Sequence, residues 1–290
     1  MDHTTRYRQA RSFGPAAGLY DLVRPRYPVK ALRWILGDLP VDVVDLGAGT
    51  GILSRQLTGL AYRVTPVEPD PQMRSKLLDA DGSLRPLAGS AEAIPLPDAS
   101  VDAVVAGQAY HWFDRSTAHP EIARVLKPHG VFGPLWNDRD EEVAWVAALS
   151  AIIAGHRAAT SAATDTADAT GRADATGTTG RADTAGTTGR ADTADTAVSA
   201  RPELTGSDLG RWFTPVERAA FRHAVTHTPD TLVELMRSRS YYLTAAPAGR
   251  HAMDTAIREL CATHPDLTGR AEFELPYVTR AYRAHRLPMP

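Results

Sequence analysis

The sequence has little of several features that mark particular classes of protein. It holds one cysteine, Cys261, among 290 residues, which excludes an intramolecular disulfide and is typical of a reducing compartment. No apolar run approaches the roughly 18 residues of a membrane-spanning helix, and the first residues lack the apolar core of a signal peptide. The 32 basic and 34 acidic side chains nearly balance, so no long-range field favours nucleic acid or an anionic membrane. We therefore expect a cytoplasmic protein with neither a nucleic-acid nor a membrane partner.

The most informative stretch is residues 41–70, which has the pattern of a strand, a glycine turn, a helix and a second strand. The β-branched run at 41–46 is typical of a buried strand. It is followed by Gly47-Ala48-Gly49-Thr50-Gly51 and by apolar residues at helical spacing from Ile52 onward. The second strand, 62–67, ends at Glu68. This is a βαβ unit with an acid at the tip of its second strand.

The spacing of these residues indicates which ligand the unit binds. Glycines let the backbone approach a ligand, and the carboxyl end of such a strand is where open parallel sheets bind nucleosides. Glu68 lies 21 positions after Gly47 and can accept hydrogen bonds from both ribose hydroxyls. The dinucleotide pattern fails because Ile52 stands where its third glycine belongs, and no phosphate-loop Gly-Lys-Ser/Thr follows. A ribose site without provision for phosphate suits S-adenosylmethionine (SAM).

At these residues the chain resembles the class I SAM-dependent methyltransferases, and within them the methyltransferase type 11 branch. The matching motifs, in family order, are Asp45–Gly51, Glu68-Pro69-Asp70 with Met73, Gly89–Asp98, Asp102 at the head of a strand, and Arg124–Gly130. The resemblance covers about residues 13–157. A narrower similarity, to the trans-aconitate-type carboxyl methyltransferases, is carried by Gln108–Phe113 and by Trp136-Asn137.

The resemblance implies SAM as cofactor, S-adenosylhomocysteine (SAH) as product, and no metal. It places cofactor contacts at Asp45, Gly47, Ala48, Gly49, Gly51, Glu68, Pro69, Ser90, Ala91 and Gln108. In the family the turn at Ser90 and Ala91 holds the adenine. Many relatives have Asp where this chain has Ser90, so a hydroxyl is expected to meet the adenine amino group instead. Gln108 is expected beside the methionine arm of SAM.

Residues expected on the substrate side come from four parts of the chain. They are Tyr20, Arg24, Tyr27, His111, Trp112, Trp136 and Tyr241. Arg24 can pair with the SAM carboxylate or with an acidic substrate. His111, just after a predicted strand, is the candidate general base; orienting its own loop is the alternative role. Trp136 either walls the substrate pocket or packs in the core.

The predicted elements form an α/β, Rossmann-like class I methyltransferase fold. We expect a mainly parallel sheet with a final antiparallel strand and helices on both faces. The strands are expected near 41–46, 62–67, 84–88, 102–107, 131–136 and 273–282, and the helices near 28–39, 52–60, 116–127, 140–157, 231–238 and 253–261.

The domain organisation follows from one change in composition. Three nine-residue units starting at Gly171, Gly180 and Gly189 contain no large apolar residue and cannot bury enough surface to offset ordering. They also lack the regular aspartates of calcium-binding rolls. We therefore expect one methyltransferase domain over residues 1–290, with a cofactor-binding core at 13–157, a flexible low-complexity insertion at 158–200, and substrate-side helices and closing strands at 201–290.

The predicted function is transfer of a methyl group from SAM to an O, N or C atom of a small molecule, with a preference for carboxylate or hydroxyl acceptors. Two alternatives stay open. One is a SAM-binding protein of this fold that does not methylate, such as a cyclase or a regulatory binder. The other is an NAD-dependent oxidoreductase, which the missing third glycine disfavours. Nucleic-acid methylation lacks the expected Asn/Asp-Pro-Pro-Tyr motif and a basic stripe.

Overall fold

The computed structural model describes residues 24–156, 204, 209–243 and 245–288. Tyr20 and the predicted insertion at 158–200 lie outside these ranges. Within them, no helix has both the length and the apolar character needed to cross a bilayer.

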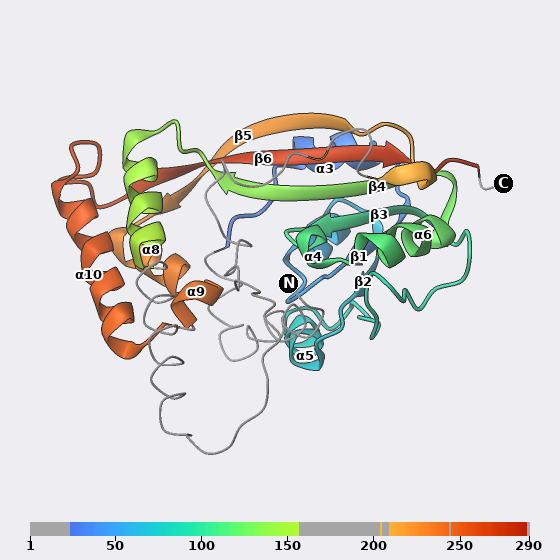
Figure 1. The fold of residues 1–290 in the computed structure, drawn as a ribbon, viewed down its shortest axis with the longest axis horizontal. Coiled ribbons are helices and arrows are strands. Elements are labelled where there is room, and N and C mark those ends of the chain that lie inside the picture. Colours follow the sequence, from blue (N-terminus) through green and yellow to red (C-terminus); the bar gives the residue numbers. More distant parts are fainter. Residues whose placement is uncertain (1–23, 157–203, 205–208, 244, 289–290) are drawn as a thin grey trace, which may run out of the picture.

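One mixed sheet of six strands organises the described chain, in the order β2-β1-β3-β4-β6-β5 (Figure 1). Its strands are β1 (Asp42–Leu46), β2 (Arg63–Val67), β3 (Val101–Gly107), β4 (Leu126–Arg139), β5 (Glu217–His227) and β6 (Phe273–His285). The first four are parallel, β6 runs antiparallel to β4, and β5 runs antiparallel to β6. This confirms the predicted Rossmann-like sheet with an antiparallel final strand.

Helices cover both faces of the sheet. They are α3 (Val29–Leu36), α4 (Ile52–Gly59), α5 (Pro71–Ala80), α6 (Arg115–Val125), a helix over residues 144–156, α8 (Pro229–Arg237), α9 (Ser240–Leu243) and α10 (Pro247–Thr263). Leu32 of α3 and Leu57 of α4 pack in one core cluster with Val105 of β3. Ile122 of α6 packs in another with Val104, whose side chain points to the opposite face because side chains alternate along a strand.

A third core cluster lies where β5 and β6 run on beyond the parallel strands. There α8 and α10 stand beside one another (Figure 1). Their buried residues, among them Leu235 and Ile257, pack with the helix at 144–156 and with Leu275 and Tyr277 of β6. The end of the sheet that carries the strands' carboxyl ends therefore faces a helical layer.

The structure corrects two features of the predicted sheet. In the stretch 84–88, expected as a strand, Leu87 alone pairs, in one parallel bridge to Val67. The Leu87 amide donates to the Pro66 carbonyl at 2.9 Å, and the Leu87 carbonyl accepts from the Glu68 amide at 3.1 Å. Strand β5 was not predicted, because its sequence, ERAAFRHAVTH, has few β-branched residues and no apolar alternation. Pairing with β6 along its whole length imposes the extended conformation.

Candidate active site

The glycine turn after β1 has the backbone conformation that its sequence predicts. Gly47, Gly49 and Gly51 have φ angles of 72°, 56° and 81°. A Cβ on Gly47 would lie 2.7 Å from the Ala109 Cβ, so that position also needs the absence of a side chain. A Cβ on Gly49 would meet no described protein atom within 4 Å. The turn is therefore packed beneath Gly47 and open above Gly49, where a ligand can approach.

Glu68 lies directly beside this turn. Its Oε2 accepts a hydrogen bond from the Gly49 amide at 2.9 Å, and its Oε1 accepts one from the Asp70 amide, also at 2.9 Å. Burial raises the pKa of this carboxyl, and the two amide donors partly oppose the rise. Each carboxylate oxygen has a second acceptor site, so both can still take a ribose hydroxyl. The arrangement fits a nucleoside ligand.

The sheet topology places these groups at a crevice. From β1 the chain crosses to β2 on one side, whereas β3 pairs with β1 on the other. Such a switch point opens a crevice outside the carboxyl ends of the strands. A cavity there, called the cofactor cavity below, is lined among others by the predicted residues Arg24, Tyr27, Asp45, Gly47, Ala48, Gly49 and Gln108. The structure thus brings five of the ten predicted cofactor residues together with two of the predicted substrate residues.

Asp45 is the acid that lines this cavity. Its side chain is almost fully buried, and its Oδ2 accepts the Ser54 hydroxyl hydrogen bond at 2.6 Å. Burial, with a smaller contribution from the negative charge of Glu68, raises the pKa of Asp45 to about 7. Asp45 therefore changes its charge near neutral pH in the free protein.

We expect SAM binding at pH 7 to release protons from Asp45. The sulfonium and ammonium charges of SAM favour the carboxylate, so binding lowers this pKa from about 7, and affinity rises as the pH rises through that value. In the free protein the sign for stability is opposite. A pKa raised from 3.8 to about 7 makes the free energy of unfolding fall as pH rises across that window. Calorimetry in two buffers of different ionisation enthalpy measures the released protons. Asp45→Asn should abolish the release, and proton uptake by the wild type would contradict the assignment.

Gln108 and Asn137 organise the mouth of the cavity. Gln108, at a left-handed φ of 57°, donates from its Nε2 to the Asn137 carbonyl at 2.9 Å. The Asn137 side chain donates to the carbonyls of Pro25 and Arg26 at 3.1 and 3.2 Å, and accepts from the Thr279 hydroxyl at 2.6 Å. Asn137 therefore joins the segment before α3, the end of β4 and β6.

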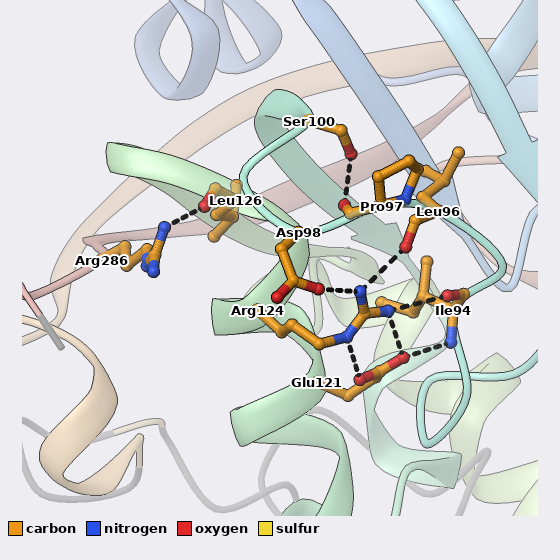
Figure 2. A network of polar contacts seen from close by, with 9 residues as sticks. All are labelled: Ile94, Leu96, Pro97, Asp98, Ser100, Glu121, Arg124, Leu126 and Arg286. Atoms are coloured by element: carbon orange, nitrogen blue, oxygen red, sulfur yellow. Dashed lines mark hydrogen bonds and ion pairs between the residues drawn. The ribbon is translucent and has the colours of Figure 1, made fainter.

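The loop that follows the turn predicted to hold the adenine is braced from α6 (Figure 2). Ser90 forms an isolated bridge with Ala93, and Ala91 is buried. Beyond that bridge, the Ile94 amide donates to Glu121 at 2.8 Å, and Arg124 donates to the Ile94 and Leu96 carbonyls at 3.0 and 2.9 Å. Arg124 also pairs with Asp98 and Glu121 at 2.6 and 2.7 Å. The charged pair on α6 thus fixes the loop that follows the turn.

Pro69 lies in the segment that links Glu68 to α5. Its carbonyl, together with that of Glu68, accepts from the Arg74 Nη1, at 2.8 and 2.7 Å. Asp70 begins α5 by accepting the Gln72 amide at 2.7 Å. These contacts hold the backbone on which the Glu68 side chain stands.

The remaining substrate candidates lie elsewhere. Asn137 points toward the α3 face, so its neighbour Trp136 points to the α6 face. There a second cavity of about 70 Å³ is lined by His111, Trp136 and Tyr282, among other residues. The Trp136 Nε1 donates to the His111 Nδ1 at 3.5 Å, a long contact. The structure therefore separates His111 and Trp136 from the described lining of the cofactor cavity.

Two further aromatic candidates are packed rather than open. The Trp112 ring lies 4.8 Å from the His111 ring and packs on the α6-side core. Tyr241 is buried in the helical cluster, where its hydroxyl contacts the Met236 sulfur at 3.3 Å. Their roles in binding substrate stay predictions.

Among the residues that line the cofactor cavity without having been predicted as site residues are Asn137 and Arg239. Asn137 stands next to Trp136, and the alternation of a strand would have shown that the two side chains serve opposite faces. Arg239 belongs to the segment 238–242, from which the similarity to the family pointed to Tyr241 instead. The signal that could have indicated Arg239 was its position as a charged residue between two predicted helices with apolar faces.

Comparison with known proteins agrees with this geometry. The model of a methyltransferase domain family, Methyltransf_11, matches residues 44–133. The uncharacterized methyltransferase Rv3342 of Mycobacterium tuberculosis is 37% identical over 273 residues, which are 94% of this chain and 95% of the relative. A malonyl-[acyl-carrier protein] O-methyltransferase of Methylococcus capsulatus is 37% identical over 131 residues, 41% of this chain and 47% of its own.

Solved structures show the same fold. That of a putative type II methyltransferase from Anaeromyxobacter dehalogenans superposes with a TM-score of 0.58, at 21% identity, over 92% of this chain and 99% of the other. With a relative matched along nearly the whole chain, and with a glycine turn beside the carboxylate of Glu68 at the switch point of the sheet, this protein belongs to the class I SAM-dependent methyltransferases.

Proposed function

We propose that this methyltransferase acts on a small molecule and methylates an O, N or C atom, with carboxylate or hydroxyl oxygen preferred. The observation that supports the cofactor half of this proposal is the contact between Glu68 and the Gly49 amide at the crevice. It offers acceptors to a ribose, while Ile52 stands where the third glycine of the dinucleotide pattern would help to seat a pyrophosphate. The acceptor half is supported by the name of the Methylococcus capsulatus relative, which is an O-methyltransferase.

The residues present fit SAM from end to end. Glu68 would hold the ribose, the turn at Ser90 and Ala91 the adenine, and Asp45 with Gln108 the methionine end. When bound, SAM supplies a methyl group on a sulfonium, already activated for in-line displacement. The task of the chain's own residues is to align the acceptor and exclude water, and positioning of this kind can supply about 7–11 kcal/mol.

The acceptor decides whether a base is needed. A carboxylate is already a nucleophile at neutral pH, whereas a hydroxyl must lose its proton. For a hydroxyl acceptor we propose His111 as the base. Its place beside the second cavity, across the sheet from the Asn137 side chain, requires the acceptor to reach around the end of β4. For a carboxylate acceptor His111 has no proton to remove.

Two measurements test the proposal. Calorimetric titration with SAM, SAH and NADH should show binding of the first two alone. Formation of SAH from SAM should then depend on an added acceptor, screened among small carboxylates and phenols. Binding of SAM without turnover on any acceptor would favour a non-methylating SAM-binding protein, and NADH binding would contradict the cofactor assignment.

A further inference from the structure

Tyr277 of β6 carries a buried hydroxyl with no hydrogen-bond partner among the described residues. The residue is 1% exposed. A phenylalanine would fill the same space without desolvating a polar group, and an unsatisfied buried donor costs about 1–3 kcal/mol. A hydroxyl kept in such a place is therefore expected to meet a ligand.

Arg139, at the end of β4, is the register partner of Tyr277 across the sheet, so the two side chains leave the same face. Within the described ranges its guanidinium forms no ion pair. The Nε is buried without an acceptor, and the Nη1 makes one long contact, 3.9 Å, with the Met236 sulfur. A half-buried cation without a carboxylate is unusual, because such charges are normally paired.

Two more arginines reach the same place from other parts of the chain. Arg24 donates from its Nη2 to the Ser238 carbonyl at 3.1 Å, which holds the segment before α3 against the turn between α8 and α9. Arg239, next to Ser238, is 8% exposed. Both arginines line the cofactor cavity.

We call Arg24, Arg139, Arg239 and Tyr277 the arginine cluster. The charges of its three arginines act on the Tyr277 hydroxyl in the same direction. All three positive charges favour the ionised form of the Tyr277 phenol, although burial raises its pKa overall. His223, stacked on Tyr277 at 5.5 Å, has its pKa lowered by burial and is neutral at pH 7.

Among the described residues that line the cofactor cavity, the carboxylate is Asp45, which already accepts from Ser54. Arg139 and Tyr277 are not among the described residues that line that cavity, and the neighbouring cavity that Arg139 borders also carries Asp140, Glu141 and Glu142. Asp140 and Glu142 are paired with Arg222, and the charges that act on the Tyr277 hydroxyl are those of the three arginines, so the surroundings of this hydroxyl favour an anion.

We propose that the arginine cluster binds an oxyanion of the methyl acceptor, a carboxylate or a phosphate, beside the cofactor. This rests on the proposed function. The SAM carboxylate by itself would occupy one guanidinium, because a single arginine can hold a carboxylate with two parallel hydrogen bonds. Arg139, whose guanidinium forms no ion pair within the described ranges, and the Tyr277 hydroxyl are then left for the acceptor, which identifies it as a molecule with at least one negative charge.

The test is titration of SAH-saturated protein with tricarballylate and with inorganic phosphate. The wild type should bind at least one of them. Arg139→Gln should weaken that binding about tenfold or more, since it removes a charge-assisted hydrogen bond, and Tyr277→Phe about threefold or more. Arg139→Lys should restore part of the loss. The control, Arg33→Gln, removes an equal charge from an exposed pair with Asp38 and should change anion affinity less than about twofold.

SAH affinity separates this proposal from the function it rests on. It should stay within about twofold of the wild type in every variant, and thermal melting confirms that each variant is folded. Equal loss of SAH and anion binding in Arg139→Gln would assign Arg139 to the SAM carboxylate and overturn the proposal, as would failure of the wild type to bind either anion. If the wild type does not bind SAH, the proposed function fails. Titration with the two anions in the absence of SAH then shows whether the arginine cluster binds an oxyanion independently of the cofactor.

Discussion

Replacing Glu68 with alanine should raise the Kd for SAH by well over tenfold. The change removes both acceptors offered to the ribose, and hydrogen bonds to a charged group contribute about 1.5–3 kcal/mol. It also leaves the Gly49 and Asp70 amides without their present acceptor, so the turn itself loosens. Calorimetry with SAH measures the first effect and thermal unfolding the second.

The control for this change is Glu259→Ala, which removes an exposed glutamate from α10 and should leave both quantities unchanged. Glu68→Gln separates charge from shape, because its amide keeps one acceptor oxygen but turns an NH2 group toward an amide donor. We expect it to lie between the wild type and the alanine variant. Near-wild-type affinity in Glu68→Ala would contradict the ribose assignment.

Replacing Arg124 with methionine should lower the free energy of unfolding by about 2–4 kcal/mol. The guanidinium donates to the carbonyls of Ile94 and Leu96 and to the carboxylates of Asp98 and Glu121 (Figure 2). Methionine keeps much of the side-chain volume but none of the donors. Loss of the Arg124 guanidinium also leaves the Glu121 carboxylate without its cation, and in the wild type that cation holds the pKa of Glu121 below its usual range. Urea unfolding followed by circular dichroism measures the change.

The same substitution should weaken SAH binding, because the loop that follows the adenine turn loses its brace. Arg63→Met is the control. Arg63 pairs with Asp42 at 2.6 Å, but it is 60% exposed, so solvent screens the pair and its loss should lower stability far less than the loss of Arg124. If the two variants were equally stable, the network on α6 would be a surface feature without consequence for the loop.

The sequence by itself determined the cofactor half of the protein. Gly47, Gly49 and Glu68 lie within one βαβ unit, and local chemistry dictates their arrangement: positive φ needs glycine, and the second strand of such a unit ends beside the turn. The strand expected at 84–88 is reduced to a single bridge between Leu87 and Val67, which its local sequence did not indicate.

Tertiary structure alone decided which substrate-side residues share a cavity. Trp136 and Asn137 are neighbours in sequence but serve opposite faces, and the face each one lines depends on the register of β4 against β6. Strand β5 forms because β6 offers it a full edge, although its own sequence does not favour a strand. Arg24, Arg139 and Arg239 come from three distant segments, and long-range packing brings their charges to Tyr277. No local sequence pattern predicts that these residues lie close together, because their proximity depends on how whole elements pack.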